Sequence, residues 1–386
     1  MATCTAVKLG ALALEHTRGK VPKWILDSLA RARAASILRY LKWWTRAYAP
    51  HAQRLAVDPV GASVLPDLVE ADPEVWRIHA AASLPHLSGA PREAILAALV
   101  NTANRQLVVA LRSVPGSDVA EARRLLIQRQ ATRIFIRTFG SVDVHRGSWT
   151  GPIIEIDKRR LRALLGLLAA FSGRVLSRDE AIDILWPDAS PGAAVNNLNQ
   201  AVFQLRRLLD PAYRDGESPQ YVLSSAESVE FSPDLVRTDL DEARRLLRRS
   251  EIASTLQESN DLLTATVRLI RGEFLPELKY EDWAAPVQAT IHSEVRASLL
   301  PIAERSRPMV DAELAVQAAL ALTRLDDFDE RAQVALALAL TDGGRRVAGR
   351  DAITRFAAKL KRELDEEPSS VVAATIRKVS MPSNEI

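Results

Sequence analysis

The order of elements expected between residues 134 and 235 constrains the fold more than any other feature of this sequence. Segment 134–144 alternates apolar and polar residues around a Gly-Ser turn, which predicts a strand pair. Segment 152–156 predicts a third short strand. Segment 158–168 then opens with a cationic turn and continues as an apolar stripe, which predicts a first helix.

The rest of this region predicts two more helices and a closing hairpin. Ser177 and Glu180 have the spacing of a capping box for a second helix, which should end before Pro187. After a loop at 188–192, segment 193–209 has helical periodicity, and segments 221–223 and 228–231 predict two paired strands. Strands, three helices and a hairpin in this order indicate a winged helix, with 193–209 as its recognition helix.

The polar face of segment 193–209 carries the functional prediction. At about 100° per residue, Leu198, Val202, Leu205 and Leu209 fall on one stripe, which should be buried. The other side is rich in amides, and Asn, Gln and Arg can pair with adenine or guanine edges in a major groove. An ordinary amphipathic helix with a solvated face is the alternative, but such faces are usually rich in Glu and Lys, and this one has neither. The expected base-reading residues are Asn196, Asn199, Gln200, Gln204 and Arg207.

The distribution of charge limits this prediction. Segment 131–236 has 12 Lys or Arg against 13 Asp or Glu, a net charge of −1, whereas DNA-binding domains are usually basic. The hairpin formed by segments 221–223 and 228–231 would be the wing. It contains Glu227 and Glu230 but no Lys or Arg, so it is not expected to enter a minor groove. We therefore expect weak binding by one domain, raised by a second copy or by polymerase. The cations are clustered, and the expected phosphate contacts are Lys158, Arg159, Arg160 and Arg206.

Several short motifs also resemble a known family. Segments 137–140, 185–187, 196–198 and 205–209 resemble the OmpR-type winged helix of SARP-class bacterial regulators. Segments 272–276, 280–283 and 363–369 resemble the bacterial transcriptional activator domain that follows this winged helix. The resemblance covers about residues 133–380 and leaves the first 130 residues outside.

The resemblance implies a DNA-binding transcription regulator, an activator that recruits RNA polymerase at directly repeated promoter elements and that could act as a homodimer. It implies that loop 186–194 is the polymerase-contacting loop, with Trp186, Asp188 and Ser190 as the contact residues. The competing hypothesis is a protein-interaction scaffold whose degenerate winged helix no longer binds DNA.

The regions on either side are expected to be helical. Residues 237–386 predict helices at 239–250, 254–271, 282–305, 312–325, 330–340 and 347–364, with small residues at helical spacing in the last three. This pattern resembles tetratricopeptide-type (TPR) repeats, which bind proteins, although a bundle that only supports the winged helix is the alternative.

The first 130 residues give a weaker signal. A long amphipathic helix is expected over 22–48, where nine Lys or Arg and only one acid, Asp27, lie between His16 and Arg54. This basic face could meet an acidic protein, a membrane surface or DNA, or could simply be solvated. Three later stretches, near residues 65–75, 84–93 and 111–119, each predict a helix end, a tight loop and a new helix, which resembles degenerate HEAT-type repeats. An unknown protein partner is expected for this region.

Composition and motifs exclude other classes. The 386 residues include one cysteine, Cys4, and no apolar run near 18 residues or signal-peptide pattern, so we expect a cytoplasmic, nucleoid-associated protein without membrane contact. Gly19-Lys20 is followed by Val21, which is incompatible with a phosphate loop, and G-x-S-x-G is absent. We expect no enzyme activity, catalytic residue, metal or cofactor.

The predicted fold class is mainly α. It consists of a helical region (1–130), a winged helix-turn-helix with small β-sheets (131–236) and a TPR-like activator domain (237–386). Strands are expected only near 133–157 and 220–232.

Overall fold

A computed structural model describes residues 2–101, 105–214, 218–305 and 311–380. The chain divides into two compact units, Met1–Ala131 with Ala212–Pro219 and Thr132–Pro211 with Gln220–Ile386, and each is described by itself. Among the described residues, no helix combines the length and the apolar character needed to span a membrane.

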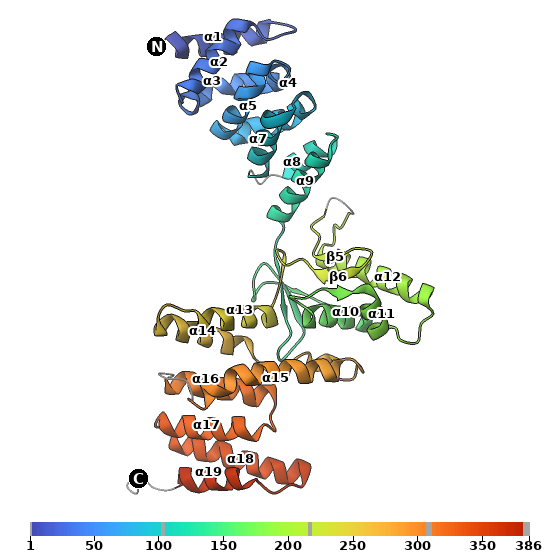
Figure 1. The fold of residues 1–386 in the computed structure, drawn as a ribbon, viewed down its shortest axis with the longest axis vertical. Helices are drawn as coiled ribbons and strands as arrows, with labels where there is room; N and C mark the ends of the chain where they lie inside the picture. The colour runs from blue at the N-terminus through green and yellow to red at the C-terminus, as the bar shows by residue number, and fades with distance from the viewer. Residues whose placement is uncertain (1, 102–104, 215–217, 306–310, 381–386) are drawn as a thin grey trace. The chain divides into compact units, whose positions relative to one another are not determined.

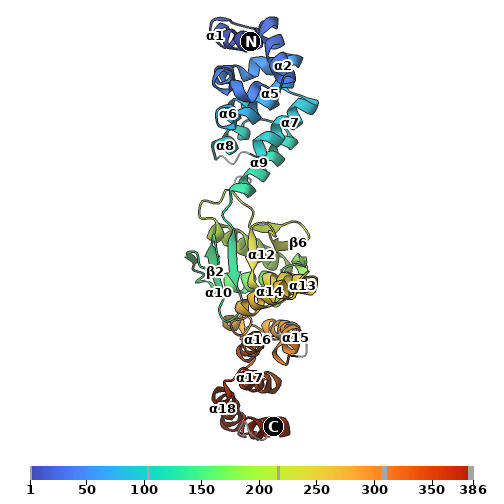
Figure 2. The same cartoon turned by 90° about the vertical axis from the view of Figure 1, so that its left-hand side faces the viewer.

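The first unit is a succession of short helices around one apolar core (Figure 2). Its largest buried side chains include Trp76 and Tyr48. The Tyr48 hydroxyl donates to the Val7 carbonyl oxygen at 2.7 Å, and burial raises the pKa of this phenol above its usual range. The helices are α1 (Ala2–His16), α2 (Lys23–Ala34), α3 (Lys42–Thr45), α4 (Ala52–Ala56), α5 (Pro59–Ala71), α6 (Pro73–Ser83), α7 (Gly89–Val100), α8 (Arg105–Arg112) and α9 (Ser117–Gln130), with 3-10 helices η1 (Leu38–Leu41), η2 (Arg46–His51) and η3 (Leu84–His86).

The continuous helix expected over 22–48 is wrong. Helix α2 ends at Ala34, and Ser36 has a left-handed backbone (φ 54°) that reverses the chain. The Ile37 N–H donates to the Ala32 carbonyl oxygen at 3.0 Å, as in a helix C-terminal motif, and short 3-10 and α turns follow. Apolar periodicity continued across this break because the later turns bury side chains in the same core, including Leu38, Leu41 and Tyr48.

The second unit begins with the winged helix, which contains two small sheets and three helices (Figure 1). In the first sheet, β1 pairs antiparallel with β2 and parallel with β7, and β3 flanks β2. In the second, β6 pairs with β4 and with β5, and the β5–β6 hairpin is the wing. The elements are β1 (Ile134–Arg137), β2 (Asp143–Arg146), β3 (Ile153–Ile154), α10 (Arg159–Ala170), β4 (Leu176–Ser177), α11 (Arg178–Leu185), α12 (Pro191–Leu209), β5 (Val222–Ser224), β6 (Ser228–Phe231) and β7 (Val236–Thr238).

The expectation that strands occur only near residues 133–157 and 220–232 is wrong, because two further strands lie outside these ranges. Strand β4 has two residues and pairs Leu176 with Val229, and β7 has three and pairs Val236 with Ile134. Segments this short contain no readable alternation, and their partners lie 53 and 102 residues away along the chain. Only tertiary pairing makes them strands.

The rest of the unit is a stack of helices in which most sequence neighbours pack together, although α14 packs against α16 (Figure 1). Alanines allow close approach in α16 and α17, where Ala315, Ala318, Ala332 and Ala335 are buried. Helix α19 was not among the expected helices. The mainly α fold class with a TPR-like C-terminal region is confirmed. The helices are α13 (Asp239–Glu251), α14 (Leu256–Leu269), α15 (Ala284–Ala303), α16 (Ala312–Leu325), α17 (Glu330–Asp342), α18 (Arg346–Leu364) and α19 (Ser370–Ser380), with 3-10 helix η4 (Pro276–Leu278).

A polar contact and an apolar contact join the winged helix to these helices. The buried carboxylate of Asp239, at the start of α13, accepts from the backbone N–H groups of Thr138 (2.8 and 2.9 Å) and Phe139 (3.1 Å) and from the Thr138 hydroxyl. Burial raises the pKa of Asp239 to about 6, although these hydrogen bonds and the nearby Arg271 oppose the rise. Beside it, the Phe139 and Phe274 rings lie 5.3 Å apart. This end of the winged helix is therefore fixed to the helical stack.

Candidate nucleic-acid interface

Helix α12 presents a polar face because its apolar face is held by the rest of the winged helix. Ser190 has the extended backbone of an N-cap residue and Pro191 occupies the first turn, which starts the helix. Leu198, Leu205 and Leu209 are 0% exposed, and the helix packs against α10, α11 and β5. The register of the helix is therefore set by its buried stripe.

The opposite side of α12 is open. Of the expected base-reading residues, Asn196, Asn199, Gln200 and Arg207 are exposed, and Gln204 is half-buried. Two apolar side chains share this side, Phe203 at 51% exposed and Val195 at 43%, and the Arg207 guanidinium lies 5.9 Å from the Phe203 ring centroid. No function was expected for Val195 from the sequence. Amides, a guanidinium and apolar groups together match what base edges and thymine methyl groups offer in a major groove.

Arg178, which the sequence reasoning missed, connects α12 to the wing. One end of its guanidinium donates to Asn199 Oδ1 at 2.6 Å, and the other donates to Ser224 Oγ at 2.8 Å. With Phe203 and Arg206 these residues line a groove between α12 and the wing. Asn199 therefore keeps its side-chain amide N–H groups for a ligand. Nothing in the sequence pattern signals a contact from the start of α11 to the wing.

The four expected phosphate-contact residues have different environments. Lys158 is exposed and donates from Nζ to Gln204 Oε1 at 3.1 Å, and Arg160 is exposed and donates to the Leu185 carbonyl oxygen at 3.0 Å. Arg159 forms an ion pair with Glu281 at 2.6 Å, although its side chain is 74% exposed. Arg206 is half-buried and donates from Nε and Nη2 to the Val222 carbonyl oxygen at 3.0 and 2.9 Å. Arg206 therefore helps to hold β5 against α12.

The wing is short and tightly turned. Ser225 Oγ accepts from the backbone N–H groups of Glu227 at 3.1 Å and Ser228 at 3.0 Å, and the Ser225 N–H donates to the Ser228 carbonyl oxygen at 3.0 Å. The carbonyl oxygen of Glu227 accepts from the Arg178 N–H at 2.9 Å. The hairpin is thus braced against the start of α11.

The turn between α11 and α12 places the expected polymerase-contact residues at the surface. Asp188 and Ser190 are exposed, and Trp186 is half-buried. The Trp186 N–H closes α11 by donating to the Ile182 carbonyl oxygen at 2.8 Å, and the Ala189 N–H donates to the Trp186 carbonyl oxygen at 3.1 Å. These bonds order the loop without engaging the carboxylate of Asp188.

Parts of this chain are similar to known proteins. Residues 238–380 match the family model described as bacterial transcriptional activator domain. The regulatory protein AfsR of Streptomyces coelicolor is 29% identical over 237 residues, which are 60% of this chain and 23% of that protein. The chain thus spans about a quarter of the length of this relative.

A solved structure of Mycobacterium tuberculosis EmbR, in complex with a low affinity phosphopeptide, is similar at 20% identity and a TM-score of 0.43, over 64% of this chain and 65% of that one. The matched activator domain, the winged helix directly before it and the similarity to AfsR support the predicted resemblance to SARP-class bacterial transcriptional regulators.

Proposed function

We propose that the protein binds double-stranded promoter DNA with α12 in the major groove. One observation carries the proposal: α12 contains no Asp or Glu, and its exposed side offers amides and a guanidinium around Phe203. A merely solvated face has no need of this composition, whereas a base edge requires donors and acceptors without negative charge. In this proposal Asn196, Asn199, Gln200, Gln204 and Arg207 read bases.

Phosphate contacts are proposed at the start of α10. Lys158 and Arg160 lie at or beside the first turn of this helix, where the positive end of the helix dipole makes cations unfavourable for stability. The same field favours a bound anion, so cations gathered there suit a phosphate. Arg159 is available only if it leaves Glu281, and Arg206 acts chiefly by holding the wing.

We propose that stable occupancy of a promoter site needs more than one winged helix. The net charge of −1 over residues 131–236 limits the affinity that counterion release can supply. A second copy on a direct repeat, or RNA polymerase, would add contacts and raise the overall affinity.

Titration of variants against DNA tests the base-reading role. Gln200→Ala and Arg207→Ala, measured with the full chain on a directly repeated site and its single-base variants, should each lose about 1–3 kcal/mol of binding free energy and relax preference at one base pair. Their unfolding free energies should change by less than about 0.5 kcal/mol.

Leu205→Ala is the control on the same helix. Its side chain is fully buried, so its damage should appear as a loss of about 2–5 kcal/mol in folding stability. If both exposed-face variants keep the affinity and preference of the wild type, α12 does not read DNA. The scaffold hypothesis, which the low charge and the acidic wing favour, would then replace this proposal.

The loop between α11 and α12 is the proposed polymerase contact, through Trp186, Asp188 and Ser190. Asp188→Lys should leave promoter affinity nearly unchanged and lower transcription from that promoter in a purified system. Asp179→Lys, an exposed acid on α11, is the matched charge control. Equal effects of the two variants, or parallel losses of binding and transcription, would contradict a specific activation surface.

A further inference from the structure

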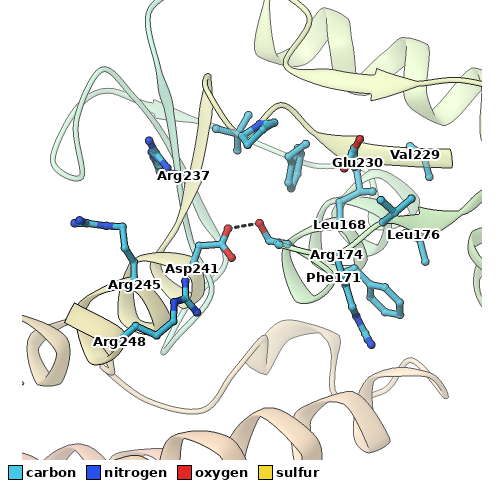
Figure 3. A pocket seen from close by; sticks show the side chains of 16 residues that line it. Leu168, Phe171, Arg174, Leu176, Val229, Glu230, Arg237, Asp241, Arg245 and Arg248 are labelled. Atoms are coloured by element: carbon cyan, nitrogen blue, oxygen red, sulfur yellow. Dashed lines mark hydrogen bonds between the residues drawn. The ribbon is translucent and has the colours of Figure 1, made fainter. Parts of the chain in front are cut away.

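A cavity of about 370 Å³ opens between the winged helix and α13 (Figure 3). It is lined by the end of α10, by strands β4, β6 and β7, and by α13. Apolar side chains line its floor, and all of them except Val175 are also packed into the core of the winged helix. The buried members are Leu168, Phe171, Leu176, Val229, Phe231 and Val236.

The rim of this cavity is cationic. Arg237 comes from β7, Arg245 and Arg248 come from α13, and Arg174 follows α10 on the other side (Figure 3). Arg245 forms an ion pair with Glu242 at 2.5 Å, and the Arg174 guanidinium lies 4.0 Å from the Phe171 ring centroid. Within the described part of the chain, neither Arg237 nor Arg248 has a carboxylate at ion-pair distance.

Two carboxylates also face the cavity but leave it net positive. Asp241 accepts a hydrogen bond from the Ser172 hydroxyl, and Glu230 lies on β6 on the side away from α13 (Figure 3). Four guanidinium groups line the cavity with these two carboxylates, and Glu242, which pairs with Arg245, is a third acid beside them, so one positive charge is left in excess. Such a lining repels a cation and attracts an anion.

We propose that this cavity binds a small organic anion with an apolar body, such as an aryl or acyl carboxylate or sulfonate. Arg237 and Arg248 bind the anionic group, since guanidinium groups form strong charge-assisted hydrogen bonds with such oxygens. The apolar floor takes the body, and the volume lies within the usual range of ligand sites. Inorganic phosphate would satisfy the rim but leave the floor uncovered.

The walls of the cavity give the ligand a structural role. One side belongs to the wing sheet, which β4 and β6 share with the hairpin beside α12, and the other side is the first helix of the activator domain. A molecule in contact with both sides stabilises their junction and therefore links occupancy to the position of the wing. The existence of the site does not rest on DNA binding, so its test can fail or succeed separately.

The test uses anilinonaphthalene sulfonate, a fluorescent organic anion, with the full-length chain. Titration should show saturable emission with a component of one molecule per chain. Arg237→Gln and Arg248→Gln should each weaken that component about tenfold, the usual order for one charge-assisted hydrogen bond. Arg249→Gln is the matched control, because Arg249 is the exposed neighbour of Arg248 and does not line the cavity.

Two further probes separate the chemical requirements. The uncharged analogue N-phenylnaphthylamine should bind weakly and with the same affinity in all variants, and inorganic phosphate should compete poorly. Thermal unfolding of each variant should match the wild type, since both arginines lie at the rim. Equal affinity of the sulfonate for the double variant Arg237→Gln/Arg248→Gln and for Arg249→Gln would overturn the proposal, as would emission without a saturable component.

Discussion

The winged helix has two polar surfaces, and they are built in opposite ways. Toward the activator domain, Thr138 and Phe139 of the winged helix donate hydrogen bonds to the carboxylate of Asp239, which begins α13 and is 1% exposed. Toward solvent, Asn196, Gln200 and Arg207 are exposed. A buried charge is tolerated only where the fold supplies its partners, so the first surface is structural. Side chains that the fold leaves exposed are the ones that can bind a ligand.

The largest effect on stability is expected at the buried contact of Asp239 with Thr138 and Phe139. Asp239→Ala should lower the free energy of unfolding by about 3 kcal/mol, because it leaves buried backbone N–H donors of Thr138 and Phe139 without acceptors. Urea denaturation followed by circular dichroism measures this loss. Asp234→Ala, an exposed acid in the β6–β7 turn, should change stability by less than about 0.5 kcal/mol. A similar small change for both variants would mean that the contact does not hold the two parts together.

The second effect is a pH dependence at the same carboxyl. Burial raises the pKa of Asp239 to about 6 in the folded protein. Since the unfolded value is about 3.9, the stability that its protonated form contributes is present below that pH and is lost as the pH rises through 6, a change of about 3 kcal/mol. The advantage of the wild type over Asp239→Asn, which does not titrate, should therefore shrink between pH 4 and pH 7.

A second acid provides the opposite sign. Burial would raise the pKa of Asp329, but hydrogen bonds from Arg296 and the Ala332 N–H lower it overall. The stability that ionised Asp329 contributes is present above the unfolded pKa and is lost as the pH falls. The free energy of unfolding of the wild type should therefore rise relative to that of Asp329→Asn as the pH rises from 3. The difference in unfolding free energy between the wild type and each Asn variant should change with pH in opposite directions for Asp239 and Asp329. The same direction for both would contradict the environments that the structure gives these two acids.

The third effect concerns the connection between α12 and the wing. Arg206→Ala should lose about 1 kcal/mol of stability, because Arg206 donates to the Val222 carbonyl oxygen. DNA affinity should fall for every sequence alike. Arg206→Lys keeps the charge but cannot reproduce the two-nitrogen contact. Recovery of affinity in the lysine variant would favour a phosphate contact, whereas continued loss would favour positioning of the wing.

The smallest effect on stability is expected at the ion pair between Arg159 and Glu281. Arg159→Ala removes a largely exposed ion pair with Glu281 and should change stability by less than about 1 kcal/mol. Glu281→Gln removes the same pair but frees the arginine. DNA titrations at two salt concentrations would show tighter binding for Glu281→Gln if Arg159 can reach a phosphate. Unchanged affinity in both variants would restrict Arg159 to a structural role.

Local patterns predicted much of the helical structure. The buried stripe of α12 follows from the spacing of Leu198, Val202 and Leu205, and the bounds of α16 were predicted as the structure has them. The Ser177 hydroxyl accepts from the Glu180 N–H at 3.1 Å, as half of the expected capping box. These features depend on residues within a few turns of one another, which a sequence displays directly.

The remaining features depend on contacts that no local pattern encodes. Asp239 begins a helix and would be read as an ordinary exposed acid there, yet its partners lie 100 and 101 residues earlier in the chain. The same holds for β7, for Arg178 between α12 and the wing, and for the cationic rim that Arg237 and Arg248 share. The order of the residues alone sets which helix faces are apolar and which are rich in amides. Tertiary structure decided which polar groups are already satisfied and which face solvent, because burial and pairing are properties of the assembled core.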